Sequence, residues 1–244
     1  MNFTESNYSK GNLSIFRSIF VFKIKLVDRL KSLALKNFHR TKWGEILILK
    51  LYLQSEEFAA TNGNYAVQDV LDNAPSWLKH ELTRHEYEEK RHVAILKNRI
   101  ENEIGFIGVV PLFFFSNRKI KKFFDLGRKY ESQFESGLLI PILVSGLIFE
   151  NVGARVFKRH IVVLDQMNLN TNTKKILISI CRDEKRHVFL FLKSIRKLIR
   201  KEEIESYRSL RREALQLERR GGLRSAFAML FLSFLPPRLF FFYR

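Results

Sequence analysis

The stretch Cys-Arg-Asp-Glu-Lys-Arg-His-Val, residues 181–188, contains a glutamate and a histidine spaced three apart, Glu184-x-x-His187. Five of these residues, Glu-Lys-Arg-His-Val, also occur earlier in the chain, where they contain Glu89-x-x-His92. Residues three apart lie on one face of an α-helix, so each copy directs a carboxylate and an imidazole to the same side. Two such helices facing each other offer two Glu and two His side chains to a pair of metal ions.

Two further acids stand almost alone in apolar runs that read as helices. Glu150 is the single charged residue between Glu135 and Arg155. Glu45 begins the run Glu-Ile-Leu-Ile-Leu, which has no other charge before Lys50. A carboxylate on a buried helix is costly unless it is neutralised or bound to a cation. Both acids are therefore candidates for the same metal site.

Helix lengths predict which acid faces which motif. Glu45 and Glu89 lie about 15 and 14 residues from the expected break between their helices, and Glu150 and Glu184 lie about 15 and 13 residues from theirs. At about 1.5 Å of rise per residue, each pair reaches the same level of two antiparallel helices. The chain thus reads as a weak internal duplication, with a Glu on one helix and the motif on the next.

Glu56 competes with Glu45 for the first position, because it lies eleven residues later and on nearly the same face. It stands close to the expected break, so Glu45 is favoured. Carboxylates combined with imidazoles suit Fe or Mn and leave positions open for O₂. The alternative is a buried ion-pair network with Arg91, Arg155 and Arg186. The predicted ligands, which would act in catalysis through the metals, are Glu45, Glu89, His92, Glu150, Glu184 and His187.

Three other side chains near the motifs are weaker candidates. His85 lies one turn before Glu89, as an outer partner of the site or as a surface residue. Cys181 lies one turn before Glu184 and reads as a small core residue. Tyr52 faces the same way as Glu45 and reads as a core tyrosine, although it could hydrogen-bond near the site.

The charge of the chain is concentrated at its two ends. The net charge is +18, of which residues 1–43 carry +7, residues 193–244 carry +8 and the middle carries +3. Basic flanks suit an anionic phospholipid surface or a nucleic acid, although a solvated basic surface is the plain alternative. A single cysteine excludes an internal disulfide and fits a reducing compartment.

Hydrophobic periodicity predicts an all-α chain with no strand. We expect a basic amphipathic helix over residues 13–37 and further helices over 41–60, 76–103, 137–165 and 173–199, with a short one near 65–71. A charged stretch over 200–220 is expected to end at Gly221-Gly222. The predicted organisation is a basic N-terminal flank (1–40), a ferritin-like four-helix bundle (41–199) and a basic, then aromatic, C-terminal flank (200–244).

No segment reads as a transmembrane helix, because the longest apolar stretch, 136–154, is interrupted by Pro141, Gly146 and Glu150. The N-terminus lacks the apolar core and cleavage site of a signal peptide. The flanking amphipathic segments and residues 104–122, an apolar run with a basic edge, are compatible with a membrane interface. A peripheral location on the cytoplasmic side of a membrane is expected.

Several short motifs recur together over residues 41–192: Gly44-Glu45 with Tyr52, the two Glu-Lys-Arg-His stretches, Val110-Pro-Leu-Phe and Phe149-Glu150. Through these motifs the chain resembles the demethoxyubiquinone hydroxylases of ubiquinone biosynthesis. This chain departs from the family in a longer first connector, in Glu150-Asn151 instead of a doubled acid, and in its basic flanks. The resemblance implies a ferritin-like, membrane-peripheral, di-iron hydroxylase that uses O₂ on a hydrophobic polyprenyl quinol precursor.

Two other functions stay open at this point. A tRNA hydroxylase that oxidises the isopentenyl side chain of a modified adenosine has the same fold, and Glu184-Lys-Arg-His187 resembles its last motif equally well. Such an enzyme binds RNA through a basic surface. The third possibility is a non-catalytic, ferritin-like, iron-binding protein attached to membranes.

Overall fold

The computed structural model describes residues 24–65, 70, 74–104, 114–169 and 171–235, and every element within them is a helix. The all-α class predicted from the sequence is therefore confirmed for the described residues. A first helix covers residues 24–38. The others are α2 (Lys42–Tyr65), α4 (Ser76–Asn98) with its π-helical extension η1 (Arg99–Ile104), α5 (Phe114–Tyr130), η2 (Glu131–Gln133), α6 (Leu139–Gln166), α7 (Asn172–Leu198) and α8 (Ile204–Leu232).

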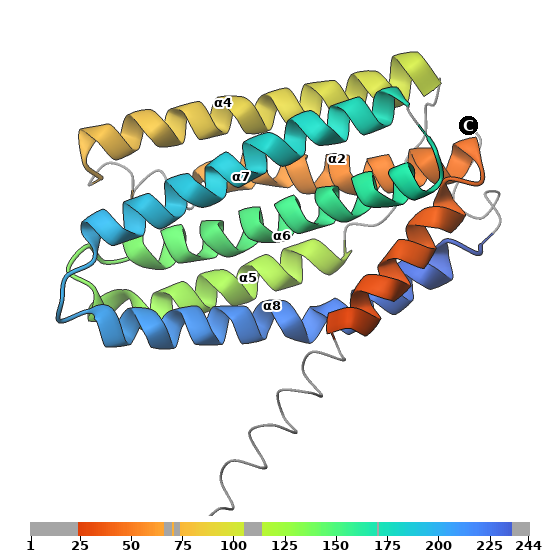
Figure 1. Cartoon of the computed structure of the whole chain (residues 1–244). Coiled ribbons are helices and arrows are strands. Elements are labelled where there is room, and N and C mark those ends of the chain that lie inside the picture. Colours follow the sequence, from red (N-terminus) through yellow and green to blue (C-terminus); the bar gives the residue numbers. More distant parts are fainter. Residues whose placement is uncertain (1–23, 66–69, 71–73, 105–113, 170, 236–244) are drawn as a thin grey trace, which may run out of the picture.

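Four long helices lie alongside one another and carry the two sequence motifs. α6 packs along α7, α2 packs along α4, and α4 packs along α7 (Figure 1). α5 and α8 cover α6 on the other side, and the helix over 24–38 crosses the C-terminal part of α8 (Figure 1). The two basic flanks meet there, since Asn37 donates a hydrogen bond to the Ser233 hydroxyl at 3.3 Å.

Two apolar clusters fill the interior, and the acidic and histidine side chains lie between them along the helices. On α6 one cluster ends at Ile148 and the other begins at Phe157, with Glu150 in the interval. On α7 the cluster that contains Phe157 ends at Cys181, and the cluster that contains Ile148 begins at Phe191. Burial of the apolar layers drives the helices together, at roughly 25 cal/mol per Å² of apolar surface. The same packing forces the polar layer between them out of water.

Two helices run past the boundaries predicted from sequence. α2 continues through residues 61–64 to Tyr65, and α8 continues through Gly221 and Gly222. Neither glycine has a positive φ. Beyond them, Ala226 is fully buried, and Leu230 packs on the apolar cluster. This packing outweighs the roughly 1 kcal/mol that a glycine costs in a helix. The predictions for residues 13–23, for most of 65–71, for 105–113 and for 236–244 lie outside the described residues.

α6 corrects the expectation that no helix is long and apolar enough to cross a membrane. Its 28 residues pass that test by length and composition, and 44% of its most apolar window is buried in the protein. The apolar run was expected to be broken by Pro141 and Gly146. Pro141 instead lies in the first turn, where its missing N–H costs nothing, and Gly146 faces the ring of Phe191.

Candidate metal centre

Two groups of four side chains meet between α2, α4, α6 and α7 and have the composition of metal sites. Each consists of Glu and His side chains whose ligand atoms all lie within 4.8 Å of one another. Glu89 belongs to both groups, so the two potential ion positions are adjacent. We call them the His85 group, made of His85, Glu89, Glu150 and His187, and the Glu56 group, made of Glu56, Glu89, His92 and Glu184.

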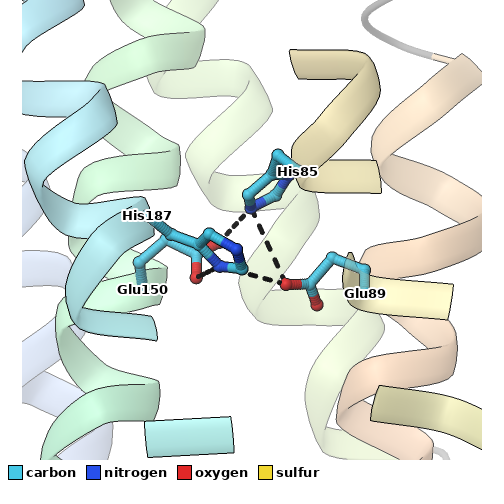
Figure 2. A group of neighbouring side chains, drawn as sticks. All are labelled: His85, Glu89, Glu150 and His187. Atoms are coloured by element: carbon cyan, nitrogen blue, oxygen red, sulfur yellow. Dashed lines mark hydrogen bonds and ion pairs between the residues drawn. The ribbon is translucent and has the colours of Figure 1, made fainter. Parts of the chain in front are cut away.

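The His85 group draws its side chains from three helices (Figure 2). His85 Nε2 lies 3.0 Å from one Glu150 oxygen, and His187 Nδ1 lies 3.2 Å from the other. Glu89 Oε1 completes the group at 3.3 Å from His187 Nδ1 and 3.7 Å from His85 Nε2. Two carboxylates and two imidazoles thus bring their ligand atoms within 4.8 Å of one another.

The Glu56 group is built around Nδ1 of His92, which is fully buried. This nitrogen lies 3.2 Å from Glu56, 3.7 Å from Glu89 and 3.8 Å from Glu184. Gly153 makes room for Glu184, because a Cβ at position 153 would collide with the Glu184 carboxylate. Three carboxylates therefore share one imidazole.

Burial and the close approach of several carboxylates raise the pKa values of two acids in the Glu56 group. Burial raises the pKa of Glu56 to about 7, and the neighbouring Glu89 adds to the rise. Burial together with Glu150, Glu56 and Glu89 raises the pKa of Glu184 well above its usual value. The Glu89 oxygen common to both groups is buried and has no hydrogen-bond partner. Buried carboxylates of this kind are stabilised by cations.

In the His85 group, the pKa values of His187 and Glu150 shift in opposite directions. Burial by itself would lower the pKa of His187, but its interactions with the carboxylates of Glu150 and Glu89 outweigh burial and raise the pKa to about 10. Burial would raise the pKa of Glu150, but hydrogen bonds from His187 and His85 outweigh it and lower this pKa. Without metal, a protonated His187 is therefore the internal cation that compensates Glu150.

An outer layer of carboxylates holds the two motif histidines in a crossed arrangement. Nε2 of His92, on α4, lies 3.2 Å from Asp183 on α7. Nε2 of His187, on α7, lies 2.8 Å from Glu88 on α4. Each imidazole thus turns Nδ1 toward the centre and donates its Nε2–H to the acid that precedes the partner motif. Such outer carboxylates set the tautomer and orientation of a metal-binding histidine.

Arginines neutralise this outer layer. Arg91 pairs with Asp183, and Arg186 bridges Glu88 at 2.6 Å and Asp183 at 3.0 Å. Arg155, proposed for an ion-pair network, instead faces Glu218 at 3.7 Å. In both copies of the Glu-Lys-Arg-His sequence, the Glu and His therefore point toward the candidate metal centre, and the Arg pairs with the outer acids.

Five of the six side chains predicted as ligands are brought together by the structure, but Glu45 is not. Glu45 lies at one end of the bundle, where Arg99 donates a hydrogen bond to it at 2.9 Å and the Thr173 hydroxyl donates another. Glu56 takes the position in its place. The two acids are eleven residues apart on one helix, hence about 16 Å along its axis. The expectation that Glu45 lies beside the other five side chains was therefore wrong.

The error came from the predicted end of the first helix. Because α2 continues to Tyr65, Glu45 lies 20 residues from the helix end and Glu56 only nine. On the facing helix, Glu89 lies 13 residues after Ser76. Glu56 is thus nearer the level of Glu89, and the shared face of the two acids made either possible from sequence.

The weaker candidates are placed as follows. His85 belongs to the centre, on the face predicted by its position four residues before Glu89. Cys181 is buried with its sulfur 3.6 Å from the Ala154 carbonyl oxygen, as expected of a core residue. Tyr52 is buried but hydrogen-bonds to His160, outside the two groups. The outer acids Glu88 and Asp183 were missed, although each immediately precedes a motif glutamate.

Comparisons with protein-family models, with curated proteins and with solved structures find no match to this chain. The side-chain geometry is therefore the basis for assigning a function.

Proposed function

We propose that this protein is a di-iron, O₂-dependent hydroxylase with a ferritin-like four-helix bundle. One observation carries the proposal: two four-ligand groups share Glu89 at the centre of four helices. Glu56 and Glu150 come from two helices, while Glu89-x-x-His92 and Glu184-x-x-His187 come from the other two. That donor pattern is typical of carboxylate-bridged di-iron and di-manganese bundles.

The donor chemistry favours iron or manganese. Four carboxylates and three imidazoles line the two groups, and the only cysteine, Cys181, lies outside them. Hard oxygen donors with imidazole suit Fe or Mn, whereas structural zinc sites are commonly built with thiolates. Bound iron would supply the reduction of O₂. The chain's own residues hold it, exclude bulk water through the two apolar clusters, and orient His92 and His187 through Asp183 and Glu88.

The proposed substrate is a hydrophobic molecule resident in a membrane, such as a polyprenyl quinol precursor, and the protein binds the cytoplasmic face as a peripheral protein. The exposed surface of α8 and of the turn that follows it supports this proposal. Phe227, Phe231 and Phe234 are 53%, 64% and 65% exposed. Arg220 and Arg224 are also exposed and precede them at helical spacings of four and three residues. Aromatic rings beside arginines suit the interface of an anionic phospholipid membrane.

The net charge of +18 favours an anionic surface over a second copy of this chain as the occupant of that face, since two such copies repel each other. Vesicles of phosphatidylcholine with phosphatidylglycerol test this. We expect F231S/F234S to bind them about tenfold more weakly or worse, since burying a Phe contributes about 1.5–3 kcal/mol. The matched control is Y87S/F189S, at 70% and 65% exposure on other helices. Equal losses in both variants, or binding to tRNA but not to vesicles, contradict the membrane assignment.

Metal analysis with O₂ consumption tests the chemistry. We expect two Fe(II) per chain after anaerobic loading, oxygen uptake on exposure to air, and a hydroxylated lipid product. Glu56→Gln should lose one ion, whereas Glu45→Gln, the control on the same face of α2, should keep both. A chain that binds no iron contradicts the proposal. Iron uptake without a stoichiometric product identifies a non-catalytic iron-binding protein instead.

The substrate can be sought by lipid extraction from a strain that lacks the protein. Mass spectrometry should show a hydrophobic precursor that lacks one hydroxyl group relative to the product in the parent strain. Restoration of the product by the wild-type chain, but not by Glu184→Ala, ties it to the metal centre. An unchanged lipid profile excludes an essential role in making such a lipid.

A further inference from the structure

A second buried cluster, made of Tyr52, His160 and His39, lies outside the candidate metal centre. The Tyr52 hydroxyl is 3.0 Å from Nδ1 of His160, on α6. Nε2 of His160 is in turn 2.5 Å from Nε2 of His39, in the turn that follows the helix over 24–38. Three segments of the chain thus form a continuous row of hydrogen bonds, and the proposed metal chemistry uses none of these side chains.

The row runs from the interior toward the surface. His160 is fully buried, Tyr52 is 7% exposed, and His39 is half-buried. Burial lowers the pKa of His160 well below its usual value, and the neighbouring His39 lowers it further. Burial also lowers the pKa of His39, partly offset by Glu45. Both imidazoles are therefore neutral near pH 7, and each has one N–H donor and one acceptor nitrogen.

The hydrogen bonds give the row a direction. Burial raises the pKa of Tyr52, with Arg159 opposing the rise, so the phenol stays protonated and donates a hydrogen bond to Nδ1 of His160. The proton of neutral His160 is then on Nε2, and this N–H donates a hydrogen bond to Nε2 of His39. His39 consequently carries its own proton on Nδ1. Each member donates to the next, and the last one is the most exposed.

Tyr52 also lies close to the candidate metal centre along its helix. It precedes Glu56 by four residues, one turn of α2 and about 6 Å of rise. Its ring packs edge-on against Phe157 at a centroid distance of 5.1 Å, within the apolar cluster. A phenol next to an oxidising centre can lose an electron near neutral pH only if its proton has somewhere to go. His160 is an acceptor in hydrogen-bond contact.

We infer that Tyr52, His160 and His39 form a proton-coupled electron relay for the centre, a role that rests on the proposed di-iron function. With iron bound and oxidised by O₂, the centre would accept one electron from Tyr52. The phenolic O–H bond breaks and its proton goes to Nδ1 of His160. The Nε2 proton of His160 goes to His39, which releases its Nδ1 proton to solvent. The product is a neutral tyrosyl radical, and one electron and one proton from an external reductant restore the phenol.

Freeze-quench electron paramagnetic resonance of the iron-loaded full chain, mixed with O₂ without substrate, tests the relay. We expect a tyrosyl signal that changes with ring-deuterated tyrosine and is absent in Tyr52→Phe. Tyr130→Phe is the matched control, because Tyr130 is also buried and its hydroxyl donates to Glu213 at 2.8 Å. Iron stoichiometry measured on each variant separates loss of the radical from loss of the centre.

His39→Gln tests the proton path without altering the fully buried His160. We expect the radical to form several-fold more slowly in this variant, and the wild-type chain to form it more slowly in D₂O. Oxygen uptake with no Tyr52-dependent radical overturns the relay and leaves the hydroxylase proposal standing. An equal rate in His39→Gln and wild type overturns the proton path. A chain that takes up no iron or oxygen overturns both proposals.

Discussion

The two ligand groups of the centre share Glu89 but differ in charge. The Glu56 group has three carboxylates and one imidazole, and the His85 group has two of each. The difference arises outside the repeated motif. The residue that corresponds to His85, four positions before Glu184, is Ile180, a fully buried core residue. A repeated motif therefore contributes to two unequal candidate sites, and the group richer in carboxylates should favour the harder, more strongly charged cation.

The shared carboxylate gives the largest expected effect. Glu89→Gln removes one negative charge from both groups, so we expect both ions to bind at least 100-fold more weakly. Anaerobic Fe(II) or Mn(II) titration followed by elemental analysis measures this. Retention of one ion at full affinity would show that Glu89 serves a single group.

Variants that change only one of the two ligand groups test the difference between them, with the next largest effects expected. Glu56→Gln should abolish binding at the three-carboxylate group and leave one ion per chain. His85→Gln keeps both carboxylates of its group, so we expect weaker binding there, by roughly tenfold, with the second ion retained. Equal losses in the two titrations would contradict the inequality of the groups.

The crossed outer carboxylates permit a similar separation. Asp183→Asn should weaken the ion held through His92, and Glu88→Gln the ion held through His187, each by about 10- to 100-fold. Competition with a chelator of known affinity resolves the two steps. If both variants weaken the same ion, the crossed arrangement is wrong.

A glycine pair tests the space behind Glu184, which belongs to the Glu56 group alone. Gly153→Ala forces a Cβ into the Glu184 carboxylate and should destabilise the fold by about 1–3 kcal/mol. Gly222→Ala on α8 meets nothing within 4 Å and should stabilise it by about 0.5–1 kcal/mol. Denaturant unfolding measures both. Unchanged stability and unchanged iron content in Gly153→Ala would show that position 153 is not packed closely against the Glu184 carboxylate.

The smallest effect concerns pH and the metal-free chain. The pKa of Glu56 is raised to about 7 in the folded state, so the folded chain binds more protons than the unfolded chain between about pH 4.5 and 7. Stability from this group is present below that range and is lost as the pH rises through it. His187, with a pKa of about 10, adds stability below about pH 6.5 that is lost toward pH 10.

Below about pH 6.5 the lowered pKa values of His39 and His160 oppose these two groups. We therefore expect the Tm of the metal-free protein to fall between about pH 6.5 and 9. The change is on the order of 1 kcal/mol, or about 2–4 °C. Bound metal takes over the compensation of the carboxylates, so the loaded chain should show a smaller fall. A Tm of the metal-free chain that rises over this range would contradict the raised pKa values of Glu56 and His187.

Local patterns account for most of the fold and for much of the centre. The helical class follows from the spacing of apolar residues, and α6 and α7 begin and end within two residues of the predicted positions. Glu150 was found because a lone carboxylate in an apolar helix needs a partner. The continuation of α8 through Gly221-Gly222 could not be found this way, because contacts made by Ala226 and Leu230 with distant segments outweigh the local preference.

The sequence by itself determined that Glu89 and His92, and likewise Glu184 and His187, share a helix face, because the helical period is a local property of the backbone. Only the tertiary structure decided that Glu56 rather than Glu45 joins them, that His85 is included, and that Asp183 and Glu88 cross over to hold the opposite histidines. These outcomes depend on how far one helix is displaced along another. That displacement is determined by the packing of two apolar clusters and by where α2 ends, neither of which a repeated five-residue motif contains.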